Sequence, residues 1–127
     1  MRMRSKQRKH DLGEVFTPMP LVSKMLRQLP SDTWTDPAKR VGDITGCGHG
    51  NFLVAVLKLK IAGGSTPEQA LSTCYGIDIM HDNIDEARQR LVSIAVDAGL
   101  DEGRAREIVE RNVVCGDALT YDWSMHH

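Results

Sequence analysis

Three short apolar runs, well separated along the chain, predict three β-strands. They are RVGDI at residues 40–44, CYGIDI at 74–79 and VVCGDAL at 113–119. A short apolar run bounded by turn residues is typical of a buried strand. Longer stretches with helical periodicity lie between the runs, so strands and helices alternate. This alternation predicts an α/β fold with a parallel sheet and right-handed crossovers.

The stretches between the strands carry clear helix signals. The apolar run from about Asn51 to Ile61 predicts a mostly buried helix, and the glycines at 63 and 64 end it. Thr66, Pro67 and Gln69 then supply a capping box with proline at the first helical position.

Two further helices are expected between the second and third strands, at residues 82–98 and 101–112. Glu86 and Arg90 fit an i,i+4 ion pair on the solvent side of the longer one. Ahead of the first strand, apolar residues at helical spacing predict a helix over 21–29, and residues 31–37 are expected to form a loop.

Composition and charge indicate one domain with a separate basic start. A length of 127 residues fits one domain, expected at residues 13–127. Residues 1–12 predict a flexible basic arm, and an arm of this kind either binds the phosphates of DNA or serves only as a solvated terminus. No run approaches the roughly 20 apolar residues of a membrane span, so we expect a cytoplasmic protein. The basic residues of the arm are Arg2, Arg4, Lys6, Arg8 and Lys9.

The cysteines and histidines show no spacing that predicts a metal site or a disulfide framework. Cys47, Cys74 and Cys115 are far apart and form no C-x-x-C pair. Each cysteine lies beside a predicted strand, so small buried thiols are expected. We therefore predict no metal.

Polar residues and glycines gather where each predicted strand ends. The first strand ends at Asp43 and runs into a turn with Gly46, Gly48 and Gly50. Asp78 follows the second strand and Asp117 follows the third. In open parallel sheets, ligands bind beyond the carboxyl ends of the strands. Each feature alone also fits a tight connection or a helix cap, but the three together indicate a nucleoside-bearing ligand.

The glycine turn differs from two common nucleotide-binding motifs. No Lys-Ser or Lys-Thr follows its glycines, which excludes a P-loop triphosphatase. The spacing is not G-x-G-x-x-G, so a nicotinamide or flavin enzyme is only a distant alternative.

Residues 46–53, GCGHGNFL, resemble motif I of the class I S-adenosylmethionine-dependent methyltransferases. The closest resemblance is to the amino-group DNA methyltransferases that modify adenine N6 in restriction–modification systems. GEVFTP ahead of the turn, and GIDI and GDAL after it, occur in the order expected of that group. The resemblance implies a truncated Rossmann-like class I methyltransferase fold, with a three-stranded parallel sheet in the order 3-2-1 flanked by helices.

The resemblance also implies a binding site for S-adenosylmethionine as cofactor. The Phe-Thr-Pro segment lines its methionine end, and the glycine turn holds the methionine and ribose part. Asp78 holds the ribose and Ile79 packs on the adenine, while the segment at Asp117 reads the adenine edge. The implied cofactor-binding residues are Phe16, Thr17, Pro18, Asp43, Thr45, Gly46, Gly48, Gly50, Asn51, Phe52, Asp78, Ile79, Asp117, Ala118 and Leu119.

Two departures from the family pattern matter. Asp43 precedes Gly46 by three residues where the family has two, so either Asp43 or Thr45 holds the methionine amino group. The chain also has no Asn/Asp-Pro-Pro-Tyr/Phe segment, whose residues contact the flipped adenine. We therefore assign no catalytic residue and expect methyl transfer to need further strands or a partner chain. In the family a fourth strand covers the first, so a homodimer or partner chain is expected at that edge.

Three other interpretations stay open. One is a stand-alone module that binds or sequesters S-adenosylmethionine without transferring its methyl group. Another is an enzyme that degrades S-adenosylmethionine itself, which needs no base pocket. The last is a structural remnant without a ligand.

Overall fold

The structure is a computed structural model, and it describes residues 24, 26–43, 47–117 and 119–122. The basic arm and residues 21–23 and 25 of the helix expected at 21–29 lie outside these residues. Leu26, which the predicted helix places on its apolar face, is buried at 2 % exposure.

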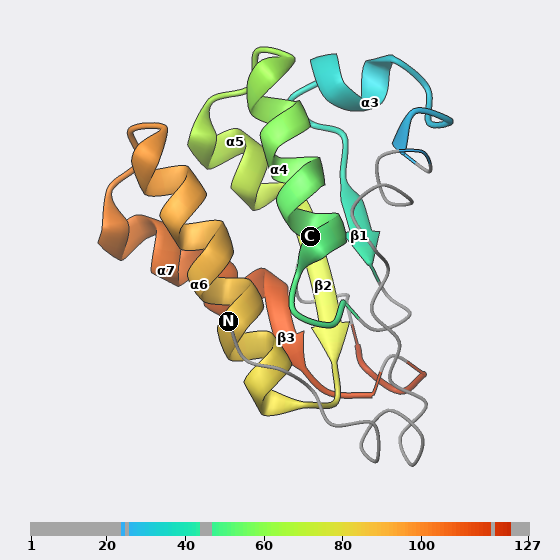
Figure 1. Cartoon of the computed structure of the whole chain (residues 1–127), viewed down its shortest axis with the longest axis vertical. Coiled ribbons are helices and arrows are strands. Elements are labelled where there is room, and N and C mark those ends of the chain that lie inside the picture. Colours follow the sequence, from blue (N-terminus) through green and yellow to red (C-terminus); the bar gives the residue numbers. More distant parts are fainter. Residues whose placement is uncertain (1–23, 25, 44–46, 118, 123–127) are drawn as a thin grey trace.

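Three parallel strands form one open sheet (Figure 1). They are β1 (Val41–Asp43), β2 (Cys74–Asp78) and β3 (Val113–Cys115). Their spatial order is β1-β2-β3, which is the predicted order 3-2-1 read from the opposite edge. Asp43 pairs with Gly76, and Asp78 pairs with Cys115. The predicted α/β class, with a parallel open sheet and flanking helices, is confirmed.

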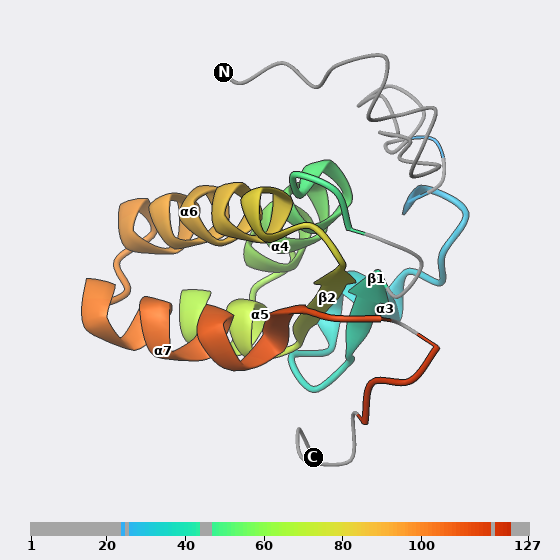
Figure 2. The same cartoon turned by 90° about the horizontal axis from the view of Figure 1, so that it is seen from below.

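Two helices follow each of the first two strands and lie on one side of the sheet (Figure 2). The connection from β1 to β2 contains α4 (Asn51–Ala62) and α5 (Pro67–Ser72). The connection from β2 to β3 contains α6 (His81–Asp97) and α7 (Glu102–Asn112). The four helices that were predicted between the strands are confirmed, with bounds that differ by a residue or two from those expected.

Alternate residues of β2 show why the helices pack on one face. The Cys74 thiol donates to the Ala70 carbonyl in α5 at 3.2 Å. Two residues on, a Cβ at Gly76 would stand 2.5 Å from Leu53 Cδ1 in α4 and 3.2 Å from Cys47 Cβ. Residues two apart on a strand point to the same face. The missing side chain at Gly76 therefore lets α4 and the glycine turn lie directly on the sheet.

The capping box predicted at α5 is present in full. The Thr66 hydroxyl accepts from the Gln69 amide at 3.1 Å, and the Gln69 side chain accepts from the Thr66 amide at 3.0 Å. Pro67 occupies the first turn, where its missing N–H would have had no helical partner. This local signal needs no tertiary contact, and for that reason the sequence alone predicts it.

The prediction of a loop at residues 31–37 was wrong, because a short helix, α3 (Asp32–Thr35), forms there. Asp, Thr and Trp have low helix propensity, so the local sequence gives no helix signal. Packing stabilises the turn instead: Thr33 is buried at 4 % exposure. The Trp34 carbonyl lies so close to Gly63 that a Cβ there would stand 1.9 Å from its oxygen.

None of the helices in the described part of the chain combines the length and the apolar character that a membrane span requires.

Candidate functional site

The glycine turn leads from β1 into α4 and takes a shape that requires glycine. Gly48 and Gly50 have φ values of +56° and +96°. Gly50 is the N-cap of α4, and a Cβ there would stand 3.1 Å from the Cα and Cβ of Ala87 in α6. Both the backbone conformation and the close approach of α6 therefore disfavour a side chain at Gly50.

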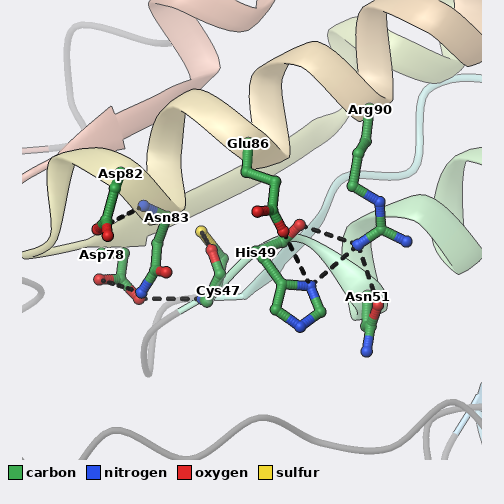
Figure 3. A network of polar contacts seen from close by, with 9 residues as sticks. Cys47, His49, Asn51, Asp78, Asp82, Asn83, Glu86 and Arg90 are labelled. Carbon is green, nitrogen blue, oxygen red and sulfur yellow. Dashed lines mark hydrogen bonds and ion pairs between the residues drawn. The ribbon is translucent and has the colours of Figure 1, made fainter. Parts of the chain in front are cut away.

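Asp78 fastens the glycine turn to the end of β2 (Figure 3). Its Oδ2 accepts from the Gly48 amide at 3.0 Å. Its Oδ1 accepts from the Met80 amide at 2.8 Å and from Asn83 Nδ2 at 3.4 Å. The residue is 9 % exposed, so these bonds lie where water competes weakly. One carboxylate therefore organises the turn and the start of α6 together.

The charge at Asp78 also affects the thiols beside it. Burial raises the pKa of Cys47 far above its ordinary value, and the nearby Asp78 and Asp43 carboxylates raise it further. Burial raises the pKa of Cys115 as well, again with Asp78 as the next cause. Both thiols therefore stay protonated at neutral pH. They are unsuited to nucleophilic chemistry, which needs the thiolate.

The ends of β2 and β3 meet beside the glycine turn. The Gly116 amide donates to the Asp78 carbonyl at 3.0 Å, and the Cys115 thiol donates to the Ile79 carbonyl at 3.5 Å. Ile79 is 58 % exposed, which is unusual for a large apolar side chain directly after a buried strand. This edge of the sheet therefore offers an exposed apolar surface next to a buried carboxylate.

Asp117 and Leu119 lie beyond the end of β3. Asp117 is exposed, and its Oδ1 accepts from the Leu119 amide at 2.9 Å. The Leu119 side chain is 94 % exposed. The structure therefore places two of the expected adenine-contacting residues on the surface, in a local turn that follows β3.

The remaining predicted site residues divide into two groups. Asp43 is half-buried in β1, Phe52 packs against the core, and Asn51 begins α4. The choice between Asp43 and Thr45 for the methionine amino group stays open. Six predicted residues lie outside the described part of the chain: Phe16, Thr17, Pro18, Thr45, Gly46 and Ala118.

Arg90 is a site residue that the sequence interpretation missed. Its Nη1 donates to the His49 carbonyl at 2.9 Å and to Asn51 Oδ1 at 2.9 Å, and it lies 3.1 Å from His49 Nδ1 (Figure 3). The i,i+4 spacing indicated a solvent-facing ion pair with Glu86. Arg90 follows Ala87 by one helical turn, and Ala87 contacts Gly50, so its place at the turn comes from packing and the sequence carries no signal for it.

Within the described residues, no three histidine, cysteine or acidic side chains form a group that can hold a metal ion. The three cysteines are free thiols, and Cys47 and Cys74 are buried as expected. Cys115 is only half-buried, which corrects the expectation for that residue.

Comparisons with known proteins give no match. No protein-family model matches the sequence, and searches of curated proteins and of solved structures find no similar protein. An open α/β sheet is shared by many unrelated families, so the fold alone assigns no activity. What the chain binds must therefore be argued from the residues at its strand ends.

Proposed function

We propose that this chain binds S-adenosylmethionine and is the cofactor-binding part of an N6-adenine DNA methyltransferase of restriction–modification type. The observation that carries the proposal is the buried Asp78 carboxylate, which lies between the glycine turn and the exposed Ile79. A carboxylate accepts hydrogen bonds from ribose hydroxyls, and an exposed apolar side chain next to it packs on adenine. The motifs in GEVFTP and GCGHGNFL support the same ligand.

Asp78 also argues for a nucleoside without phosphates. Glycine turns at a helix N-terminus commonly bind phosphate through free backbone amides. Here the Asp78 carboxylate already accepts from the Gly48 amide at 3.0 Å. A phosphate placed there meets a buried negative charge and loses that donor. S-adenosylmethionine instead carries a sulfonium cation and no phosphate, so its charge suits this turn.

Calorimetric titration with S-adenosylmethionine, adenosine and ATP tests the proposal. We expect S-adenosylmethionine to bind more tightly than adenosine, and ATP to bind most weakly. Absence of heat with millimolar S-adenosylmethionine, or tighter binding of ATP, contradicts it.

The variant Asp78→Asn isolates the role of the charge. We expect it to weaken S-adenosylmethionine binding by about tenfold, since hydrogen bonds to a charged group are the stronger kind. The variant should also reduce the difference in affinity between S-adenosylmethionine and ATP, because the negative charge that disfavours phosphate is gone. Asp97→Asn, at the exposed far end of α6, is the matched control and should bind normally. Thermal unfolding of both variants separates a lost ligand contact from a lost fold.

Methyl transfer itself is proposed for an assembly that includes an Asn/Asp-Pro-Pro-Tyr/Phe segment, because this sequence contains no Pro-Pro. The chain and duplex DNA, incubated with methyl-labelled S-adenosylmethionine, should give no labelled DNA until such a segment is supplied. Labelled DNA from the chain alone would show that the acceptor segment is dispensable. We propose a cytoplasmic location for this activity.

We propose that DNA contacts the basic arm at residues 1–12, which lies outside the described part of the chain. Each phosphate that a basic side chain neutralises steepens the fall of affinity with salt. Replacing the five basic residues of the arm by glutamine should therefore flatten the salt dependence of DNA binding. An unchanged slope would remove the arm from the interface.

The outer edge of β1 is proposed as the place where a second copy or a partner chain adds its strand. In the described sheet β1 pairs only with β2, and the Val41 amide bonds toward β2. Amides alternate in direction along a strand, so the Gly42 amide faces outward. Gly42→Pro removes that donor and should lower self-association in sedimentation experiments. A wild-type chain that stays monomeric at high concentration would limit the proposal to a different partner chain.

A further inference from the structure

We propose that Arg90 is a positioning residue that holds the glycine turn in the shape that receives the ligand. The proposal deepens the S-adenosylmethionine site proposed above and rests on it. It concerns a side chain outside the glycine turn and the strand ends, at the middle of α6. It is carried by the contacts of this side chain, which join the turn to α6.

One nitrogen of Arg90 reaches three acceptors around a single residue of the turn (Figure 3). Nη1 lies 2.9 Å from the His49 carbonyl, 3.1 Å from His49 Nδ1 and 2.9 Å from Asn51 Oδ1. His49 and Asn51 are the neighbours of Gly50 on either side. Arg90 therefore fixes the chain immediately before and immediately after Gly50.

The conformation of Gly50 decides where the start of α4 points. Gly50 has φ of +96°, its amide donates to the Cys47 carbonyl at 3.1 Å, and its carbonyl accepts from Val54 at 2.8 Å. A glycine at this position can rotate into many other conformations. Rotation there would redirect the N–H groups of the first turn of α4, which point out of the helix N-terminus toward the proposed ligand. A fixed guanidinium on both sides opposes that rotation.

The turn is thus held at two places by the segment β2–α6. Asp78 holds the Gly48 amide with a negative charge, and Arg90 holds the residues on either side of Gly50 with a positive charge. Both anchors are charge-assisted hydrogen bonds, which are shorter and stronger than neutral ones. Without Arg90, the residues on either side of Gly50 lose a charge-assisted anchor to α6.

The His49 ring reports on this contact directly. A guanidinium nitrogen donates hydrogen bonds and accepts none, so a hydrogen bond from Arg90 to His49 Nδ1 requires the tautomer in which Nδ1 accepts with its lone pair and Nε2 carries the hydrogen. Glu86 Oε2 lies 3.8 Å from the same Nδ1. Loss of Arg90 removes the donor and changes the electronic state of Nδ1. The nitrogen chemical shifts of the imidazole therefore give a signature that does not depend on ligand.

Arg88 is a matched control on the same helix. Its Nε donates to the Val113 carbonyl at 2.7 Å and its Nη2 to the Glu110 carbonyl at 3.3 Å. It therefore joins α6 to α7 and β3, and none of these bonds involves the turn. Arg88 and Arg90 are both partly buried arginines that hold backbone carbonyls, so their substitution disturbs the fold in similar ways.

The experiment compares Arg90→Gln, Arg90→Lys and Arg88→Gln with the wild type. Affinity for S-adenosylmethionine is measured by calorimetry, stability by thermal unfolding, and the His49 ring by nitrogen-15 spectroscopy of the ligand-free protein. We expect Arg90→Gln to weaken binding by about tenfold and to shift the His49 nitrogen signals. Arg90→Lys should recover part of the affinity. Arg88→Gln should lower the melting temperature while affinity and the His49 signals stay near wild type.

Two results overturn the positioning role while leaving the proposed function intact. One is wild-type affinity in Arg90→Gln when the wild-type chain binds S-adenosylmethionine. The other is an equal loss of affinity in Arg88→Gln and Arg90→Gln, which would show a general effect of stability. A wild-type chain that binds no S-adenosylmethionine overturns the proposed function and this inference with it.

Discussion

At the scale of single residues, two charged side chains organise the candidate site, and the sequence predicts only one of them. Asp78 could be predicted, because an acid directly after an apolar strand stands out in the pattern. Arg90 could not, because its role depends on which face of α6 meets the turn, and Gly50 makes that contact through its missing Cβ. Contacts between residues 39 and 41 positions apart follow from packing rather than spacing.

The three cysteines should react with alkylating agents in a fixed order. Cys115 is half-buried, while Cys47 and Cys74 are 6 % and 1 % exposed, so Cys115 should react first. Its raised pKa makes it slower than a free thiol, because the thiolate is the reactive form. S-adenosylmethionine packed on the neighbouring Ile79 should slow the reaction further. Mass spectrometry of alkylated peptides measures both effects, and an unchanged rate with ligand would place the adenine elsewhere.

At the scale of elements, the sequence predicts helices that have local start and stop signals, but not a helix that depends on packing. The bounds of α5 follow from its capping box, and the helix at 81–97 follows from its apolar stripe, so the sequence predicts both. α3 has no comparable signal, since its four residues form a helical turn only where they meet the end of α4. Sequence patterns therefore predict the elements that carry their own start and stop signals, and miss the one that a neighbour induces.

The contact between α3 and the end of α4 should be sensitive to a single methyl group. A Cβ at Gly63 would stand 1.9 Å from the Trp34 carbonyl oxygen and 2.7 Å from its carbon, and backbone cannot move aside as a side chain can. Gly63→Ala should lower the free energy of unfolding by about 3 kcal/mol, the upper part of the range for overpacking. The measurement is urea unfolding.

Gly64→Ala serves as the comparison for this prediction. Gly64 has φ of +110°, but no atom lies within 4 Å of a Cβ built there. The substitution therefore introduces backbone strain without a clash, and we expect a loss of about 1 kcal/mol. A loss at Gly64 that equals or exceeds the loss at Gly63 would show that the close approach of Trp34 is unimportant.

At the scale of the whole molecule, one core cluster joins the helices to the sheet, and it encloses titratable groups. Burial raises the pKa of Cys74 to about 12 from its ordinary 9.0. Burial lowers the pKa of Lys60, whose side chain is fully buried and donates to the Lys39 carbonyl. The alternation of strands and helices predicts this core in outline. It does not predict the buried Lys60, because a lysine in the last turn of a helix is typically exposed to solvent.

Stability should therefore change at alkaline pH, and Cys74 should account for part of the change. Above about pH 9 the unfolded chain loses the thiol proton while the folded chain keeps it, so stability falls as pH rises toward about 12. For one thiol the slope is at most about 1.4 kcal/mol per pH unit. Lys60 acts in the opposite direction, since the folded chain loses its proton at a lower pH than the unfolded chain.

Urea unfolding of wild type and Cys74→Ala between about pH 8 and pH 10.5 separates the thiol from the other groups. We expect the variant to lose stability less steeply above about pH 9, whatever its stability at neutral pH. Parallel curves for the two proteins would show that Cys74 ionises alike in the folded and unfolded chains.

The Asp78 carboxylate at the end of β2 has a limited number of lone pairs, and this limits how a ligand can bind to it. A carboxylate offers about four acceptor positions. Gly48, Met80 and Asn83 already use three of those at Asp78. A sugar diol presents two hydroxyl donors, so it cannot be fully accommodated unless one internal donor leaves. Ligand and Asn83 in the first turn of α6 then compete for the same carboxylate. The Asn83 side-chain amide makes the longest of the three bonds, at 3.4 Å, so saturation of the site should change the nitrogen-15 signal of that amide.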